Sequence, residues 1–263
     1  MDKLISVVTG GSSGIGLEVV NCLKNTSKVY ELSRHGKSYD DVEHIDTDVT
    51  IKSSVENAIN EIITKEGKID ILVCCAGFGI SGAIEFTDVE DAKKQVDVNF
   101  FGIYNTVHAV LPFMREKKSG RIVCISSVAG VVAIPFQTMY SVSKYSINAF
   151  TCALGCEVKP FGISVTSVMP GDTKTGFTKN RNKITVGDDV YEGRISRSVS
   201  GMEHDEQNGD SAKKAGEFIS KIALKKHVKP LYTIGFKYKV LTVLIKLLPT
   251  SLAYKIVYSI YAK

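Results

Sequence analysis

The sequence predicts an α/β fold, a doubly wound parallel sheet, and three observations support this prediction. Short apolar runs of strand length alternate with longer segments of helical period. The short runs are rich in β-branched residues, which is typical of strands that are covered on both faces. A glycine-rich turn follows the first run directly and opens the first helical segment. Alternation of strand and helix along a chain predicts a parallel sheet with helices on both sides.

Six runs are predicted as strands, at residues 4–8, 28–32, 44–45, 69–74, 121–125 and 163–168. Helices are expected at 16–24, 53–65, 99–117 and 137–159, because apolar residues recur there at helical spacing over a sufficient length. Beyond them we expect a helix at about 211–225 and a short strand near 231–234. No linker or repeat occurs before residue 171, so residues 1–263 are predicted to form a single domain.

The pattern breaks between residues 172 and 210. This stretch is polar, shows no sustained period and contains five glycines. A segment of this length in a compact domain is typical of a functional lid or a mobile loop, with short helices of its own. We therefore expect 172–210 to be a lid over the substrate. The chain then ends in an apolar, basic helical segment at 237–263, which Pro249 divides in two.

Composition excludes several classes of protein. Of the 263 residues, 44% are hydrophobic and 23% are charged, which is typical of a globular chain and not of a disordered or collagenous one. The first apolar run is too short for a signal sequence or a membrane span, so we expect a cytoplasmic protein. The six cysteines lie inside apolar runs and lack metal-ligand spacing. Free thiols in a reducing compartment and no metal site are the expectation.

The glycine-rich turn predicts a phosphate-binding loop. It reads Thr9-Gly10-Gly11-Ser12-Ser13-Gly14-Ile15-Gly16. Gly10 permits a tight turn, Gly14 lets the backbone approach a pyrophosphate, and Gly16 allows close packing of helix on strand. The helix that begins there offers unpaired N–H groups and the positive end of its dipole to a dinucleotide. An ordinary βα turn is the alternative, but the position after the first strand of a βαβ unit disfavours it.

The spacing TGxxxGxG resembles that of the short-chain dehydrogenase/reductase family, in its compact single-domain branch. Asp48-Val49 after the third predicted strand, Asn99 within the next helical segment, Pro170-Gly171 and Thr175 resemble further motifs of the family. The resemblance runs from residue 3 to about 175 and implies a Rossmann-fold oxidoreductase that acts on CH–OH groups with a nicotinamide cofactor. One motif departs, because Cys74-Cys75-Ala76-Gly77 stands where the family has Asn-Asn-Ala-Gly.

The resemblance also implies which residues bind the cofactor. NADP(H) is favoured over NAD(H), because Ser33 and Arg34 end the second predicted strand where NAD-preferring members have an acid. A guanidinium pairs with a 2′-phosphate, whereas a carboxylate repels it. Glu31 lies two residues earlier and leaves NAD(H) as the weaker alternative. The cofactor-binding residues are expected to be Gly10, Ser12, Ser13, Gly14, Ile15, Gly16, Ser33, Arg34, Asp48, Val49, Ala76, Gly77, Tyr140, Lys144, Pro170, Gly171, Thr173 and Thr175.

Four residues are predicted to carry the catalysis. Tyr140 and Lys144 lie four apart on one predicted helix and therefore share a face. Ser127 stands at the end of the fifth predicted strand, where ligands bind in open α/β sheets. Tyr140 would exchange a proton with the substrate oxygen, Ser127 would hold that oxygen, and Asn99 would interrupt its helix and anchor water. Lys144 is expected to lower the phenol pKa from its ordinary value of about 10.

Apolar residues around this site indicate a lipophilic small-molecule substrate, and the resemblance implies a ketone or secondary alcohol of steroid, retinoid or lipid type. A catalytically idle NADP(H)-binding sensor or scaffold is the alternative function, which the four catalytic residues disfavour. We expect a homodimer or a homotetramer. The apolar candidates are Val131, Val132, Ile134, Phe136, Met139 and Phe177.

The end of the chain is strongly basic. Residues 213–263 carry eleven lysines and one acid, a net +10, whereas the preceding 212 residues carry 22 − 27 = −5. Two interpretations of 237–263 stay open: the helices cover the substrate mouth or a subunit interface, or they lie on an anionic membrane surface in a weak peripheral contact. Nucleic acid is not an expected partner, because no arginine and aromatic interleaving accompanies the lysines.

Overall fold

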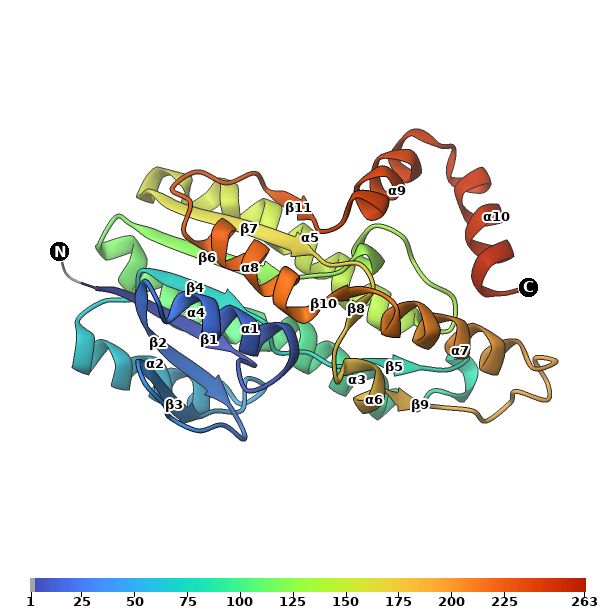
Figure 1. Ribbon diagram of the computed structural model, residues 1–263, viewed down its shortest axis with the longest axis horizontal. Coiled ribbons are helices and arrows are strands. Elements are labelled where there is room, and N and C mark those ends of the chain that lie inside the picture. The colour runs from blue at the N-terminus through green and yellow to red at the C-terminus, as the bar shows by residue number, and fades with distance from the viewer. Residues whose placement is uncertain (1–2) are drawn as a thin grey trace.

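A computed structural model, which describes residues 3–263, confirms the predicted α/β fold (Figure 1). Its main sheet has seven parallel strands in the order β11-β7-β6-β4-β1-β2-β3. From β1, the chain adds β2 and β3 on one side of the sheet and then β4, β6, β7 and β11 on the other. This reversal creates a crevice at the carboxyl ends of β1 and β4. The strands are β1 Leu4–Thr9, β2 Ser27–Ser33, β3 Val42–Asp46, β4 Ile71–Cys74, β6 Gly120–Ile125, β7 Ile163–Met169 and β11 Leu231–Thr233.

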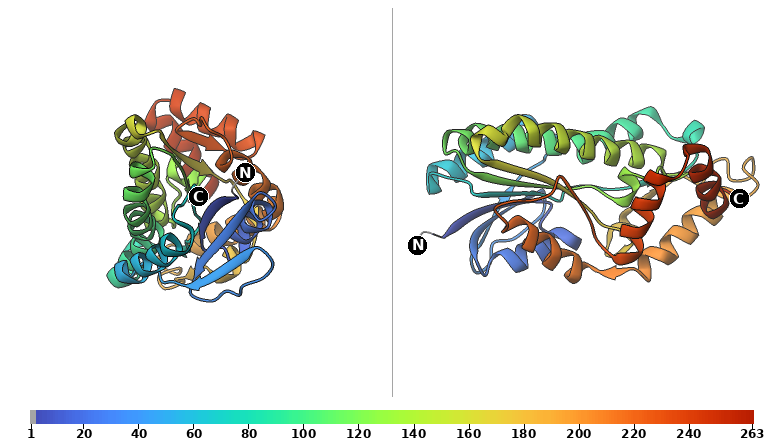
Figure 2. Two further views of the ribbon diagram at one scale, coloured as in Figure 1. Left: turned by 90° about the vertical axis from the view of Figure 1, so that its left-hand side faces the viewer. Right: turned by 90° about the horizontal axis from the view of Figure 1, so that it is seen from above.

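Helices cover both faces of the sheet, as the three layers in Figure 2 show. One face packs against α2 Lys52–Glu66, α4 Gly102–Glu116 and α5 Thr138–Val158, and the other against α1 Gly14–Leu23 and α8 Ala212–Ala223. Each layer has a core of its own, because the strands are apolar on both sides. Ile59, Met114 and Ile147 are fully buried in the first core, and Leu23 and Ile219 in the second.

Smaller elements gather beyond the carboxyl ends of the strands, at the right of Figure 1. The helix α3 Val89–Val96 leads into α4 through a π-helical turn, Asp97–Phe101. One short parallel pair, β5 Ile80–Ser81 with β9 Asn182–Lys183, fastens the region after β7 to the body. A second pair, β8 Thr173–Lys174 with β10 Asp210–Ser211, joins the two ends of that region, which contains the helices α6 Phe177–Asn180 and α7 Arg194–Gln207. The chain ends in the helices α9 Phe236–Leu247 and α10 Thr250–Tyr261.

The structure confirms the short strand predicted near 231–234 and differs from the sequence prediction in two other details. The predicted strand near 231–234 is β11, which pairs with β7 as a seventh strand of the sheet. The predicted helix at 99–117 starts only at Gly102, because residues 97–101 form the π-helical turn. α3 was not expected at all; Asp88 caps it by accepting a hydrogen bond from the backbone N–H of Glu90.

The segment 172–210 is more ordered than its polarity suggested. It contains α7, a helix of 14 residues whose Ile195, Val199 and Met202 are buried at helical spacing. At both ends of the segment, Thr173 to Ser211, the short strands β8 and β10 pair with each other. Among residues 3–263, no helix is long and apolar enough to cross a bilayer.

Candidate active site

The glycine loop forms a tight turn between β1 and α1 that only glycine can make. Gly10 has a positive φ of 67°, and a Cβ there would lie 2.7 Å from the backbone of Ala76. A Cβ on Gly16 would lie 2.1 Å from the carbonyl oxygen of Gly10, so the first turn of α1 packs directly on the end of β1. The N–H groups of residues 14–16 precede the first intrahelical hydrogen bond, which Leu17 donates to Ser13, and are free for a phosphate.

Beyond the end of β2, Arg34 lines the same cavity as the glycine loop, and its positive charge helps to hold the pKa of Asp48 below its ordinary value. The Asp48 carboxylate itself accepts hydrogen bonds from the N–H and hydroxyl of Thr50. Glu31, by contrast, is 3% exposed and binds the ring of His44, with Oε2 to Nδ1 at 2.6 Å. Its Oε2 is therefore engaged with another side chain, while Oε1 has no hydrogen-bond partner among the described residues, and Glu31 lines an adjoining hollow with Ser12 and Arg34 rather than this cavity.

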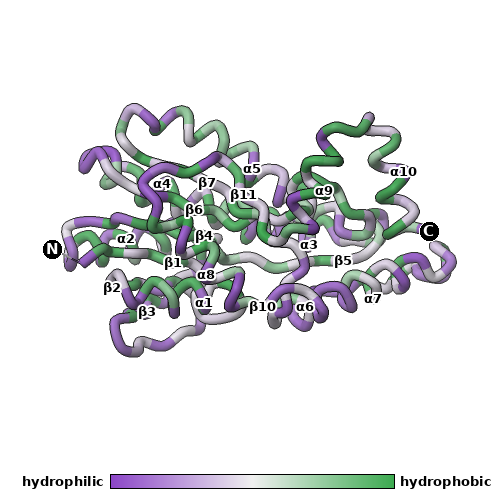
Figure 3. The backbone as a smooth tube through the Cα atoms, turned by 45° about the horizontal axis from the view of Figure 1, so that its top comes forward, coloured by the Kyte–Doolittle hydropathy of each residue, from purple (hydrophilic) through white to green (hydrophobic). Residues whose placement is uncertain are grey.

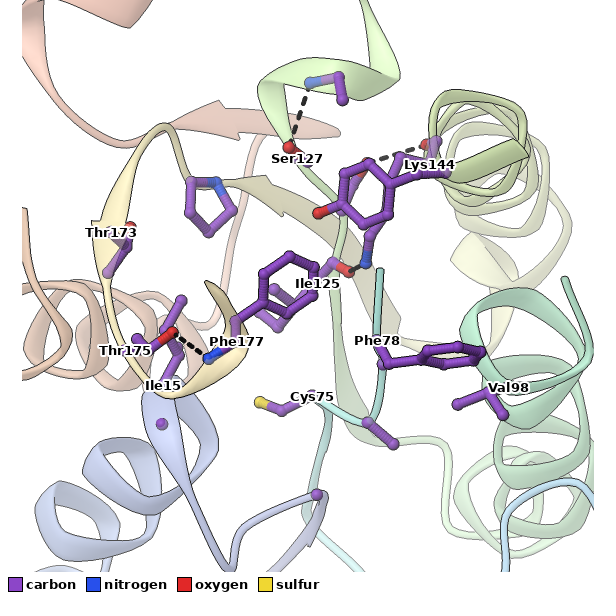
Figure 4. Close-up of a pocket in the computed structure, with 18 of the residues that line it drawn as sticks. Ile15, Cys75, Phe78, Val98, Ile125, Ser127, Lys144, Thr173, Thr175 and Phe177 are labelled. Atoms are coloured by element: carbon purple, nitrogen blue, oxygen red, sulfur yellow. Dashed lines mark hydrogen bonds between the residues drawn. The ribbon is translucent and has the colours of Figure 1, made fainter. Parts of the chain in front are cut away.

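Tyr140 and Lys144 lie one turn apart on α5, and Ser127 faces them from the end of β6. The Lys144 side chain is nearly buried, and its Nζ donates a hydrogen bond of 3.0 Å to the carbonyl oxygen of Ile125 (Figure 4). The same Nζ lies 5.6 Å from the centre of the Tyr140 ring. The Ser127 hydroxyl accepts a hydrogen bond of 3.1 Å from the N–H of Ala129, which orients it at the start of a short helical turn. The fold thus brings three predicted catalytic residues together.

Burial dominates the electrostatics of this group. It raises the pKa of Tyr140 to about 12, although a hydrogen bond with Ser127 acts in the opposite direction. It also lowers the pKa of Lys144 to about 8. The net shift in the pKa of Tyr140 is upward because desolvation of the phenolate is its largest cause, and Lys144 is not among the charges that act on it here, so the lowering of the phenol pKa by Lys144 stays a prediction. At neutral pH both groups carry their protons.

Asn99 lies in the π-helical turn between α3 and α4, so the helix is interrupted at this residue as expected. Its side chain is fully buried and bridges two elements. The Nδ2 group donates to the carbonyl oxygen of Phe78 and to Ser143 Oγ, both at 3.0 Å, while Oδ1 accepts from the N–H of Phe78. A Cβ on Gly77 would lie 3.1 Å from Asn99 Oδ1 and 3.8 Å from Lys144 Nζ, so Gly77 stands between them. Asn99 does not line the cavity itself.

Cysteines replace the two asparagines that the family has after β4. Cys74 is fully buried in the first core and acts as a small apolar residue. Cys75 donates its backbone N–H to the carbonyl of Thr9 and is half-buried at the cavity wall, on the opposite side from Ser127 (Figure 4). Backbone hydrogen bonding thus connects β4 to β1 at this point.

One cavity of about 1060 Å³ joins these features. All the residues predicted to bind the cofactor line it, together with Ser127. The glycines of the loop leave room for a backbone approach, and Arg34 offers a cation for an anionic group. These residues fit a nicotinamide dinucleotide. Of the six apolar substrate candidates, Val132, Ile134 and Phe177 line the cavity, whereas Val131, Phe136 and Met139 do not.

Among the lining residues that the sequence did not identify individually, two groups bear on the substrate, although one interpretation placed 237–263 over the substrate mouth. Carboxylates reach the cavity from the segment after β7, and Glu206 among them is paired with Arg181. Apolar side chains reach it from α9 and α10. Asp172 could have been found from its position next to Pro170-Gly171, and the α9 residues from their helical spacing. The missed residues are Asp172, Asp205 and Glu206, and Tyr238, Leu241, Ile245, Ile256, Val257, Ile260 and Tyr261.

Comparison with known proteins agrees with the geometry of the site. The family model for short chain dehydrogenase matches residues 4–185. A 3-ketodihydrosphingosine reductase of Bacteroides thetaiotaomicron is 40% identical over 231 residues, 86% of each chain. A 3-dehydrosphinganine reductase of Danio rerio is 32% identical over 247 residues, 88% of this chain and 70% of that protein.

Among solved structures, ElxO with NADP bound is similar to this chain, with a TM-score of 0.75 and 26% identity. The superposition covers 91% of this chain and all of that one. The match of the family model over more than half of the chain, together with the order of the strands, identifies an oxidoreductase fold. The chain belongs to the short-chain dehydrogenase/reductase family.

Proposed function

We propose that this oxidoreductase is an NADPH-dependent reductase of a long-chain amino ketone of the 3-ketodihydrosphingosine type. The observation that carries the proposal is that one end of the cavity is polar and the other end is apolar. Its phosphate end has the glycine loop and Arg34, and its other end is walled by apolar side chains of α9 and α10. Ser127, Tyr140 and Lys144 lie between the two ends. A substrate with a ketone near its head and a long apolar tail fits this arrangement.

The carboxylates of the cavity wall favour a cationic head group. Glu206 is paired with Arg181, but Asp172 accepts only a hydrogen bond, from the hydroxyl of Tyr238. Burial raises the pKa of Asp172, and the charge of Asp205, which lines the same wall, adds a smaller effect in the same direction. An ammonium group near the ketone is attracted to this wall, whereas an acidic carrier such as a phosphopantetheine thioester is repelled. The names of two relatives point to the same class of amino ketone.

The cofactor choice rests on Arg34. A guanidinium at the end of β2 pairs with a 2′-phosphate, and the neighbouring Glu31 is held by His44. The similarity to ElxO, a solved structure with NADP bound, supports the same choice. NADP(H) is therefore proposed over NAD(H).

The side chains divide the work of ketone reduction among them. A bound nicotinamide supplies the hydride. Ser127 would donate a hydrogen bond to the substrate oxygen and hold it beside the phenol of Tyr140. Because burial raises its pKa to about 12, Tyr140 carries its proton at neutral pH and would give it to that oxygen as the carbonyl bond becomes a single bond. The Lys144 ammonium would return a proton to the phenolate.

The experiment is a direct assay of reduction. Purified protein is mixed with NADPH and 3-ketodihydrosphingosine, and the loss of NADPH absorbance is followed together with the appearance of the amino diol by mass spectrometry. We expect turnover with NADPH and much slower turnover with NADH. Tight NADPH binding without turnover on this ketone or on steroid and retinoid ketones would instead support a cofactor sensor.

A further inference from the structure

The outward face of α9 is apolar, although it faces solvent. Phe236 is 83% exposed and Leu247 is 76% exposed, at the two ends of the helix. Val240, Val243 and Leu244 lie between them, also exposed, at spacings that place all five side chains on one stripe. The one fully buried residue of the helix is the polar Thr242. The usual pattern of a surface helix is thus reversed on α9.

The exposed stripe continues on α10 after the break at Pro249. Leu252, Ile256 and Ile260 recur one turn apart and are 46%, 42% and 63% exposed. Figure 3 shows the hydrophobic colour along both helices at this end of the molecule. Of the 21 large hydrophobic side chains that are exposed in residues 3–263, ten lie between Phe236 and Ile260. We call the eight stripe residues the C-terminal apolar face: Phe236, Val240, Val243, Leu244, Leu247, Leu252, Ile256 and Ile260.

Lysines flank this face and no acid accompanies them. By helical spacing, Lys237 lies at one margin of the α9 stripe and Lys239 and Lys246 lie at the other. Lys255 lies at a margin of the α10 stripe. Residues 218–263 contain no aspartate or glutamate. Apolar side chains between two margins of lysine are typical of a helix that lies in the plane of an anionic bilayer surface.

The opposite faces of the same two helices line the active-site cavity. Leu241 and Ile245 of α9 belong to its wall, and so does the buried Val257 of α10. Ile256 and Ile260 belong to the cavity wall and to the exposed face at once, so the apolar wall is continuous with the apolar exterior. A molecule with a long hydrocarbon tail would not need to cross polar surface between a bilayer and the cavity.

We propose that the C-terminal apolar face docks on an anionic phospholipid bilayer, with α9 and α10 lying in its surface, and that an amphiphilic substrate enters the cavity between these helices. Docking follows from the stripe and its lysines alone; the entry route rests on the proposed function. A second copy of this chain is the competing occupant of such a face. Two copies that met here would bring their lysine margins together, which like-charge repulsion disfavours.

The test of docking uses the full chain and vesicles, without substrate. Co-sedimentation is measured with vesicles of equal parts phosphatidylcholine and phosphatidylglycerol, and with phosphatidylcholine vesicles. We expect binding to the mixed vesicles that weakens as salt is raised, and little binding to the neutral ones. Replacing either Val243 or Leu247 by Glu should abolish binding, and Lys239→Glu should weaken it about tenfold or more.

Matched controls separate docking from general effects on charge or folding. Val190→Glu introduces the same change at another exposed valine, which is 64% exposed, and Lys117→Glu reverses an exposed lysine outside the face. Both should bind vesicles as the unaltered chain does. Circular dichroism and NADPH binding report whether each variant is folded.

Each remaining outcome would overturn docking. These are no vesicle binding at low salt, equal binding to neutral vesicles, or unchanged binding of folded Val243→Glu and Leu247→Glu. Light scattering that gives a dimer for the unaltered chain and monomers for these variants, with no vesicle binding, would assign the face to a second copy.

The entry route has a separate readout. In the folded, non-binding variants, reduction of a ketone carried in vesicles should fall, while reduction of a short-chain, water-soluble analogue should not change. Loss of both activities would contradict the entry route. A chain that reduces no ketone but binds anionic vesicles would refute the proposed function and leave docking intact.

Discussion

Tyr140, which is half-buried, holds its proton because desolvation of its phenol disfavours the phenolate, and the buried Lys144 beside it loses its own proton more easily because desolvation disfavours the ammonium. The pKa of Tyr140 is about 12 and that of Lys144 about 8, so both groups are protonated below pH 8. Ketone reduction consumes a proton from this pair. The kcat for reduction should therefore not change with pH near neutrality on account of these two groups. It should fall as the pH rises through about 8, where Lys144 deprotonates.

Measuring kcat for reduction across this pH range, with the protein shown to remain folded, tests the assignment. A rate of reduction that climbed with pH through 8 would mean that the deprotonated forms are the active ones. That result would contradict the role of Tyr140 as an acid.

Arg34 is the residue on which the choice of cofactor depends. Arg34→Asp should weaken NADPH binding by about 10–100-fold, because a charged hydrogen-bonding partner of the 2′-phosphate is lost and a repulsive carboxylate takes its place. NADH binding should change much less. Dissociation constants from fluorescence titration measure both, and Arg115→Asp, at an exposed arginine of α4, is the control. Equal losses for the two cofactors would remove Arg34 from the phosphate site.

The negative charge of Asp172 is expected to make the protein bind an amino ketone more tightly than a ketone without an amino group. Asp172→Asn keeps an oxygen that can accept the hydrogen bond of Tyr238 but removes the negative charge. KM for the amino ketone should rise about tenfold or more, with KM for the same ketone lacking its amino group unchanged. Asp189→Asn, an exposed position in the segment before α7, is the control. Parallel changes for both ketones would show that the charge of Asp172 does not select the substrate.

At the scale of elements, the region between β7 and α8 contains a cluster of ion pairs, in which Arg181 contacts Glu206 and Glu203, and Lys183 contacts Glu203. The side chain of Arg181, after α6, is fully buried and pairs with Glu206 of α7, which also accepts a hydrogen bond from Thr178. Removing one partner of a buried pair leaves the other charge uncompensated and costs about 3–5 kcal/mol. We expect this cost to appear as local opening of 172–210.

Limited proteolysis measures that opening. Arg181→Ala should be cleaved faster within 172–210 than the unaltered chain or Arg197→Ala, which alters an exposed arginine on α7. NADPH and substrate together should slow cleavage if the segment closes over them. Equal rates with and without ligands would contradict the prediction of a lid.

Sequence periodicity predicted the elements that belong to the sheet and its covering helices, because burial on both faces leaves a strong apolar pattern. It did not predict α7, since only three of its apolar residues turn inward among many polar ones, nor α3, which buries only Gln95. For β11, periodicity indicated a strand but did not show which strand of the sheet it pairs with. Pairing with β7 depends on contacts far along the chain.

For the candidate site, too, local patterns in the sequence predicted some residues, whereas residues placed by distant contacts were not predicted. Residues within local motifs, from the glycine loop to Tyr140, were predicted by spacing and by resemblance. For 237–263, one of two interpretations placed the helices over the substrate mouth, but the residues of α9 and α10 that line the cavity were not predicted individually, because no local motif marks them and their position depends on how the two helices fold back over the site. The upward net shift in the pKa of Tyr140 depends on desolvation, which spacing does not give.

For the whole molecule, the parallel sheet explains how distant parts of the sequence form one site. The ends of β1, β2, β4, β6 and β7 meet at one edge, where the order of strands reverses. That edge contributes the glycine loop, Arg34, Ser127 and the loop after β7, and α5 adds Tyr140 and Lys144. The C-terminal helices complete the cavity at its apolar end. Their lysines, which make this part of the chain basic, flank the exposed face that we propose to dock on an anionic bilayer.

Reduction of a ketone by NADPH, with the proton supplied by Tyr140, is the activity that we propose for this cavity. The most direct measurement is single-turnover oxidation of bound NADPH by 3-ketodihydrosphingosine in the unaltered chain and in Tyr140→Phe, with NADPH affinity measured in both. The account predicts that the phenylalanine variant binds NADPH normally and reduces the ketone about 10²–10⁴-fold more slowly. A variant that turns over at nearly the unaltered rate would contradict it.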